Sequence, residues 1–174
     1  MKARAVLYVA LVGGLLALLG FAVVLQDYSS ARPQANGAGG VKFAFTDLNG
    51  NTVNITSFRG KVVLLDAMAS WCIPCFAENQ HLQKIVQLYP NDVQVISMTV
   101  DPTDTASNLR HYVANNNVTW PMFQFNPTVV ATIHSTDLPS LIVYDRQGVQ
   151  RDRFSGLTDV ATMQAAVTEV LNSY

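Results

Sequence analysis

Residues 61–88, KVVLLDAMASWCIPCFAENQHLQKIVQL, constrain the fold of this chain more than any other segment. The segment opens with a run of Val and Leu that is too short for a helix, which predicts a buried central strand. From residue 74 to 88 the apolar residues recur at helical spacing, and the Tyr-Pro-Asn sequence at 89–91 is expected to end that helix. The chain's only two cysteines, Cys72 and Cys75, lie where the strand gives way to the helix. We therefore expect the chemistry of the chain at this junction.

The other predicted elements extend this strand and helix into an α/β domain. Apolar and polar residues alternate on both sides of Asn49-Gly50, a dipeptide that suits a type I′ turn, so an N-terminal β-hairpin is expected there. A second helix is expected within residues 101–117, with Asp104 or Thr105 as its N-cap. The pattern also predicts a strand at 93–100, two strands at 140–145 and 148–156 joined by a turn at 146–148, and an amphipathic helix at 159–174. This order of elements predicts a mixed central sheet flanked by helices.

The N-terminal region predicts one transmembrane helix. Residues 5–25 form an uncharged, mostly apolar run of 21 residues, close to the ~20 that a helix needs to cross a bilayer. Lys2 and Arg4 precede the run and Asp27 follows it, so residues 1–4 are expected to form a cytoplasmic stub. The alternative is a signal peptide cleaved near Ala31, but its apolar core would normally span only ~7–15 residues. Under either interpretation the rest of the chain acts outside the cytoplasm.

Composition separates a tether from a folded domain. Residues 26–40 are rich in Ser, Ala, Gly and Pro and are expected to form a flexible tether. The folded domain is expected at residues 41–174, where eight Lys/Arg and eleven Asp/Glu give a formal charge of −3. No basic run or aromatic–basic stripe is present in the sequence, which argues against a nucleic-acid partner.

The two cysteines are predicted to form a redox-active disulfide. At the start of a helix, the sulfur of Cys72 would face free N–H groups and the positive end of the helix dipole, which favour the reactive thiolate. Cys75, one turn later, could attack a mixed disulfide on Cys72 and release the product, while Pro74 stiffens the first turn. A structural cross-link is less favoured because so short a loop restrains the unfolded chain little. No second Cys-x-x-Cys is present to complete a zinc site, so neither a metal nor a separate cofactor is expected.

Two carboxylates near the cysteines have two interpretations each. Asp66 interrupts the apolar strand; if it is buried, its pKa would be raised and it could take a proton from Cys75. It could instead reach solvent at the end of the strand. Glu78 lies three residues after Cys75, on nearly the same helix face. It could serve the same proton transfer, or it could be a solvated first-turn glutamate that the helix dipole stabilises.

Pro139 stands at the entry to the strand at 140–145, where a proline is either an edge feature or part of a cis peptide. Together with WCIPC at 71–75 and the aspartate six residues before Cys72, it makes the chain resemble the thioredoxin fold. FTDLNGNTV, followed by SFRGKVVLLDAMASWCIPC, is similar to the membrane-anchored thioredoxin-like oxidoreductases of the TlpA, ResA and CcmG type. The resemblance covers about residues 41–174.

The resemblance implies a role for each matching residue. Cys72 would be the attacking cysteine and Cys75 the resolving one, while Asp66 matches thioredoxin's buried aspartate and Glu78 the glutamate of the ResA-like group. The residues implied in shielding the pair or binding an extended substrate segment are Trp71, Ile73, Pro74, Leu138 and Pro139. The family reduces protein disulfides outside the cytoplasm, commonly in cytochrome c or copper-site maturation, with electrons from a membrane thiol carrier. The Ile-Pro dipeptide between the cysteines resembles thioredoxin's Gly-Pro and favours a reductant.

The sequence departs from the ResA-like pattern at two places, and it also bears comparison with two other families of related fold. Asn79-Gln80 replaces a proline often seen after the glutamate, and DAMAS replaces the usual aromatic-rich approach to the cysteines. The segment ISMTVDPTDTASNLRHYV, followed by IHST, is similar to Sco copper chaperones, so a copper(I) chaperone is the alternative function. Sco proteins have three residues between their cysteines and a distal histidine; here two residues intervene, and His134 is expected to lie in solvent on a loop. A peroxiredoxin-type peroxidase would have a threonine where Ala69 stands.

Overall fold

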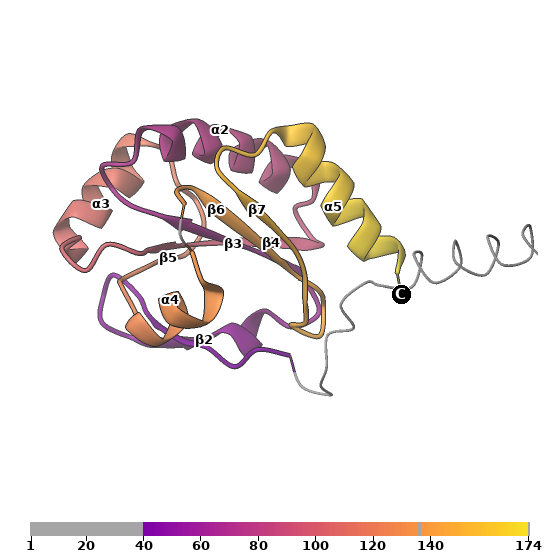
Figure 1. Cartoon of the computed structure of the whole chain (residues 1–174), viewed down its shortest axis with the longest axis horizontal. Helices are drawn as coiled ribbons and strands as arrows, with labels where there is room; N and C mark the ends of the chain where they lie inside the picture. Colours follow the sequence, from indigo (N-terminus) through magenta and orange to yellow (C-terminus); the bar gives the residue numbers. More distant parts are fainter. Residues whose placement is uncertain (1–39, 136, 174) are drawn as a thin grey trace, which may run out of the picture. The chain divides into compact units, whose positions relative to one another are not determined.

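The computed structural model describes residues 40–135 and 137–173 (Figure 1). The anchor expected at 5–25 and the tether up to residue 39 lie outside these residues, and no helix within them is long and apolar enough to cross a bilayer. The elements are β1 (Ala44–Thr46), β2 (Thr52–Asn54), the 3-10 helix η1 (Ile55–Phe58), β3 (Val62–Met68), α2 (Ile73–Leu88), β4 (Val93–Thr99), α3 (Ala106–Asn115), β5 (Met122–Phe123), α4 (Pro127–Ile133), β6 (Ser140–Tyr144), β7 (Gln150–Ser155) and α5 (Val160–Asn172).

The main sheet has five strands in the order β5-β4-β3-β6-β7, with β3 in the middle. β3 pairs in parallel with β4, and β4 with β5, whereas the β3–β6 and β6–β7 pairs are antiparallel. The predicted mixed sheet with a central, fully buried β3 is therefore confirmed. The strand–turn–strand segment at 140–156 and the helices near residues 74–88 and 159–172 are confirmed as well.

Helices cover both faces of the sheet, and alternate residues of β3 face opposite layers. Val62, Leu64 and Met68 pack in one apolar cluster with residues of α2, α3 and α5. Val63 and Leu65 pack in the other cluster, with residues of α4, η1 and the segment around β1. Figure 1 shows α2 and α5 on one side of the sheet and α4 with the hairpin on the other. Because side chains alternate, the side chain of Asp66 belongs to the α2 layer.

The N-terminal hairpin forms as expected, but the prediction of a type I′ turn is wrong. β1 and β2 pair antiparallel in a separate two-stranded sheet. Within the Asn49-Gly50 dipeptide only Gly50 has a positive φ (87°), whereas a type I′ turn needs two such residues. The side chain of Asp47 explains the longer loop, because its carboxylate accepts hydrogen bonds from the backbone N–H groups of Asn49 and Asn51, both at 2.8 Å.

Two short elements between α3 and β6 were not predicted. β5 has two residues and pairs in parallel with β4, a length too short for an alternating pattern to be recognised. α4 has seven residues and starts with a signal that the sequence does contain: Asn126 accepts hydrogen bonds from the N–H groups of Thr128 and Val129, and Pro127 opens the first turn.

Candidate redox site

Cys72 and Cys75 form a disulfide at the start of α2, with their Cα atoms 5.3 Å apart. Cys72 is the N-cap of the helix, and its sulfur accepts a hydrogen bond of 3.2 Å from the backbone N–H of Cys75. Pro74 lies in the first turn, where its missing N–H removes no intrahelical bond. Both sulfur-bearing residues are almost fully buried. The predicted position of the pair, at the positive end of a helix, is thus the observed one.

Two large apolar side chains next to the buried cysteines in the sequence are exposed to solvent. Trp71 is 63% exposed and Ile73 is 80% exposed, although residues of their kind are usually covered. The indole N–H of Trp71 donates to a carboxylate oxygen of Asp101 at 2.6 Å, and this bond is the main cause that lowers the pKa of Asp101. The tryptophan is therefore held in a fixed orientation while its ring remains open to a partner.

The Leu138–Pro139 peptide bond is cis, so the second of the two interpretations of Pro139, a cis peptide, is the observed one. Ser140, the next residue, pairs with Ala67 near the end of β3 that leads to the cysteines. Leu138 packs against the apolar cluster that contains both cysteines. The carbonyl oxygen of Pro139 accepts a hydrogen bond of 2.8 Å from Gly156, which fixes the neighbouring loop between β7 and α5.

Asp66 is buried, which excludes the solvent-reaching interpretation. It lies opposite Ser97 in the β3–β4 register, and the Ser97 hydroxyl donates to its carboxylate at 2.7 Å. The indole N–H of Trp120 in turn donates to the Ser97 hydroxyl at 2.8 Å. Among residues 40–135 and 137–173, no group donates a hydrogen bond to the other carboxylate oxygen. Burial raises the pKa of Asp66 to about 7, an effect that the Ser97 hydrogen bond opposes.

Glu78 is fully buried rather than solvated. One carboxylate oxygen accepts a hydrogen bond of 2.9 Å from the backbone N–H of Thr158, and the other has no hydrogen-bond partner in the part of the chain that the structure describes. Burial and the negative charge of Asp66 raise the pKa of Glu78 to about 8, against the Thr158 hydrogen bond. Two carboxyl groups near the cysteines can therefore hold or release a proton close to neutral pH.

Several residues of the site were not found from the sequence. Ser97 and Trp120 lie 31 and 23 residues from their hydrogen-bond partners, and Thr158 lies 80 residues from Glu78. The Tyr112 hydroxyl donates to the carbonyl of Cys75 at 3.4 Å. Such contacts carry no local sequence signal, because only the folded sheet brings the partners together.

Asn79, at the position where the related pattern often has proline, is a structural residue here. It is buried, and its side-chain amide donates to the carbonyl of Asn116 at 2.8 Å. Gln83, one turn later on α2, donates to the same carbonyl at 2.8 Å. The departure thus joins α2 to the end of α3.

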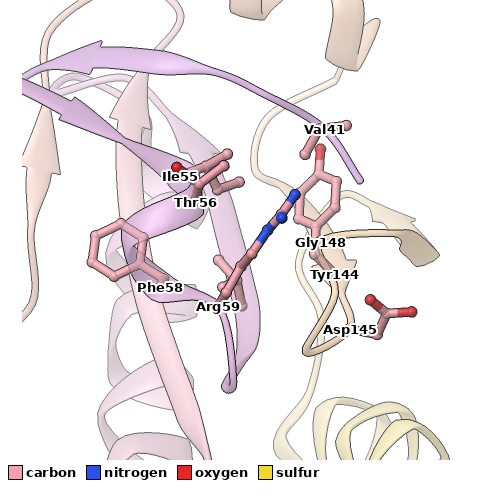
Figure 2. A pocket seen from close by; sticks show the side chains of 9 residues that line it. Val41, Ile55, Thr56, Phe58, Arg59, Tyr144, Asp145 and Gly148 are labelled. Atoms are coloured by element: carbon pink, nitrogen blue, oxygen red, sulfur yellow. The ribbon is translucent and has the colours of Figure 1, made fainter. Parts of the chain in front are cut away.

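His134 is exposed, as expected, and forms the left-handed C-cap of α4 with φ 45°. Among residues 40–135 and 137–173, no group of three or more His, Cys, Asp or Glu side chains is arranged to hold a metal ion. A small hollow lined by Phe58, Arg59, Tyr144 and their neighbours is shown in Figure 2. It includes Val63 at the start of β3, whereas the cysteines follow the other end of that strand. The hollow is therefore separate from the redox site.

The sequence matches the AhpC/TSA family over residues 37–153, which is most of the folded part. The chain belongs to the AhpC/TSA family. One curated relative is the thiol-disulfide oxidoreductase ResA of Bacillus cereus. It is 25% identical to this chain over 132 residues, which cover 75% of each of the two chains. ResA of Geobacillus thermodenitrificans is 24% identical over 144 residues, covering 82% of each chain.

Solved structures show the same fold. A DsbF homologue from Corynebacterium diphtheriae superposes with a TM-score of 0.69 at 19% identity, covering 79% of this chain and 90% of that one. StoA from Bacillus subtilis superposes with a TM-score of 0.61 at 17% identity, covering 75% and 98%. These likenesses confirm the predicted thioredoxin-like fold. The Cys72–Cys75 disulfide and the ResA relatives identify this AhpC/TSA member as a thiol–disulfide oxidoreductase of the ResA type.

Proposed function

We propose that this oxidoreductase is a membrane-tethered reductant of protein disulfides that acts outside the cytoplasm, in the maturation of cytochrome c or copper-site cysteines. The observation that carries the proposal is the Cys72–Cys75 disulfide at the N-terminus of α2, with the buried carboxyl groups of Asp66 and Glu78 near it. The relatives named ResA support the same type of activity.

In the first step, the reduced enzyme attacks through Cys72. Its thiolate is favoured at the helix N-terminus, where the backbone N–H of Cys75 already points at the sulfur. The thiolate attacks one sulfur of the substrate disulfide, a mixed disulfide forms, and the other substrate sulfur leaves as a thiolate that takes up a proton.

In the second step, Cys75 resolves the mixed disulfide. Its thiol must lose a proton, and Asp66 or Glu78 accepts it, since burial raises the pKa of both carboxyl groups toward neutral pH. The Cys75 thiolate attacks the sulfur of Cys72, the enzyme disulfide forms, and the second substrate thiol is released. Two electrons pass to the substrate, and a membrane thiol carrier then reduces the enzyme again.

The substrate surface surrounds this pair. Trp71 and Ile73 offer exposed apolar area, and Pro74 keeps the first turn rigid. Leu138 packs against the apolar cluster that contains the cysteines, and the cis Pro139 follows it. We assign to these five residues the binding of an extended substrate segment. Leu157 belongs with this group: it is 50% exposed and lies between Gly156, which bonds to Pro139, and Thr158, which bonds to Glu78.

The proposed site of action depends on residues 5–25 as a membrane anchor, with residues 1–4 in the cytoplasm and a tether at 26–40. Cleavage near Ala31 would instead release the domain. The intact mass of the protein recovered from membranes decides between the two: a mass that includes residues 1–31 supports the anchor, and a shortened soluble protein contradicts it.

A trapping experiment tests the mechanism. In a Cys75→Ser variant the mixed disulfide on Cys72 cannot be resolved, so substrate should remain covalently attached. A Cys72→Ser variant should lose turnover and trap nothing. Failure to recover any trapped protein from Cys75→Ser membranes would contradict the proposed roles of the two cysteines.

The direction of electron flow is tested by the reduction potential. We expect a value near that of thioredoxin, about −270 mV. The measurement equilibrates the protein in glutathione or dithiothreitol buffers and counts alkylated thiols. A value of about −120 mV would make the protein a disulfide donor and would overturn the proposal that it acts as a reductant.

A further inference from the structure

The loop between β4 and α3, with the sequence DPTDT at 101–105, reaches the segment in front of Cys72. The N-cap of α3 was expected at Asp104 or Thr105. Thr105 takes the N-cap role and accepts a hydrogen bond from the N–H of Asn108. The carboxylate of Asp104 is therefore available for other partners.

Asp104 is buried, and both of its carboxylate oxygens accept hydrogen bonds. One oxygen accepts from the backbone N–H of Ser70 at 2.9 Å and from the Thr99 hydroxyl at 2.6 Å. The other accepts from the Ser70 hydroxyl. The carboxylate thus joins the end of β4 to the residue two positions before Cys72.

The segment that Asp104 holds is the turn that places the attacking sulfur. The backbone N–H of Cys72 donates to the carbonyl of Ala69 at 3.1 Å, so Ser70 and Trp71 form the middle of a tight turn. Asp104 fixes Ser70 within this turn by accepting hydrogen bonds from both its backbone N–H and its hydroxyl, and the Thr99 hydroxyl donates to the same carboxylate. Its position decides how Cys72 enters α2 as the N-cap.

We propose that Asp104 is a positioning residue for thiol–disulfide exchange, which keeps the sulfur of Cys72 at the N-terminus of α2 by holding Ser70. The inference rests on the proposed role of Cys72 as the attacking thiol. Without Asp104 the turn loosens, the sulfur spends less time near the N–H of Cys75, and the helix terminus stabilises the thiolate less. Asp104 does not touch the substrate and takes no proton in the reaction.

Other charged or titratable side chains lie on the elements next to the cysteines. They are Asp66 on β3, Glu78 and His81 on α2, Asp101 on the β4–α3 loop, and Tyr112 on α3, whose hydroxyl donates to the carbonyl of Cys75. All of them stay in place in the variants below. Loss of the Asp104 negative charge alone would favour the Cys72 thiolate, whereas loss of positioning disfavours it, so the two effects have opposite signs.

The test measures the rate at which iodoacetamide alkylates Cys72 as a function of pH, in the full-length chain with Cys75→Ser so that one thiol remains. We expect Asp104→Ala to move the midpoint to higher pH and to lower the rate at pH 7 about two- to fivefold, the range of a helix-terminus interaction. Asp104→Asn should move it in the same direction and by less. Asp92→Asn is the control, since Asp92 pairs with Arg146 beside the start of β3.

If Asp104→Ala leaves the midpoint of the alkylation curve unchanged, the inference is overturned. A shift of that midpoint to lower pH would also overturn it, because such a shift shows an effect of charge alone. If Asp104→Ala does not fold, Ser70→Ala and Thr99→Val each remove one hydroxyl partner and keep the charge. Both should shift the midpoint upward, and no shift in either would overturn the inference. The alkylation rate does not depend on trapping a substrate. If Cys75→Ser traps no substrate, the role of Cys72 as the attacking thiol is contradicted, and the alkylation result still decides whether Asp104 positions the sulfur.

Discussion

The carboxylate of Glu78 accepts a hydrogen bond of 2.9 Å from the backbone N–H of Thr158, 80 residues further along the chain. The bond joins the first turns of α2 to the loop between β7 and α5. That loop also contains Gly156, whose N–H donates to the carbonyl of Pro139. One carboxyl group thus connects the helix of the disulfide to the loop beside the cis-proline.

Replacing Glu78 should separate its structural contribution from its charge. Glu78→Ala leaves the buried N–H of Thr158 without a partner, which should cost about 1–3 kcal/mol of unfolding free energy relative to Glu78→Gln. The glutamine keeps an acceptor oxygen for that N–H. Urea denaturation of both oxidised variants at pH 7 checks this, and equal unfolding free energies would contradict the role of the bond.

The stability of the oxidised protein should fall between about pH 4 and pH 8. Burial raises the pKa of Asp66 from 3.8 to about 7, and burial with the charge of Asp66 raises that of Glu78 from 4.5 to about 8. The folded state therefore binds these protons more tightly than the unfolded state. Their favourable contribution is complete below the unfolded pKa values and is lost as pH rises through the folded ones. Unfolding free energies measured by urea across this range check the slope.

Asp66→Asn should flatten this slope and stabilise the oxidised protein at pH 8 by about 1–3 kcal/mol, because it removes a buried group that must ionise. Asp92→Asn, at an exposed carboxylate that pairs with Arg146, is the control and should keep the wild-type slope. An unchanged slope in Asp66→Asn would show that Asp66 titrates near its ordinary value.

Ser97→Ala should raise the pKa of Asp66 further. The Ser97 hydroxyl is the group that lowers this pKa, and it also accepts from the indole N–H of Trp120. Titration of the Asp66 carboxyl by infrared or carbon NMR spectroscopy measures the shift. Ser140→Ala is a matched control, since that buried serine donates to the carbonyl of Asp137 instead. A midpoint unmoved by Ser97→Ala would exclude Ser97 from control of Asp66.

Ile73→Asn should weaken recognition of protein substrates without destabilising the fold. The Ile73 side chain is 80% exposed, so its removal changes little in the core. We expect KM for a protein disulfide to rise about three- to tenfold, as for the loss of one apolar contact. Reduction of a small disulfide should continue at the wild-type rate. Leu88→Asn, at the last residue of α2 and 52% exposed, is the control; an equal effect there would show that the surface near Ile73 has no special role.

The strand and helix around the cysteines were predictable because their signals are local. A Val- and Leu-rich run before Cys72 predicts β3, and apolar spacing after Cys75 predicts α2. β5 and α4 were missed because two and seven residues are too few for a periodic pattern. The hairpin was found from alternation, but its turn type depends on the side-chain hydrogen bonds of Asp47, which the dipeptide does not reveal.

The sequence by itself determined which residues meet at the strand–helix junction, namely Trp71 and the cysteine pair, and that a helix begins at Cys72. The exposure of Trp71 is known only from the structure. Only the tertiary structure decided the state of the carboxylates, because burial is a property of packed layers rather than of local sequence. It placed Asp66 against Ser97, Glu78 against Thr158, and Asp104 against Ser70. Each of these bonds joins residues more than thirty positions apart, and the sheet register and the loops at its edge bring them together.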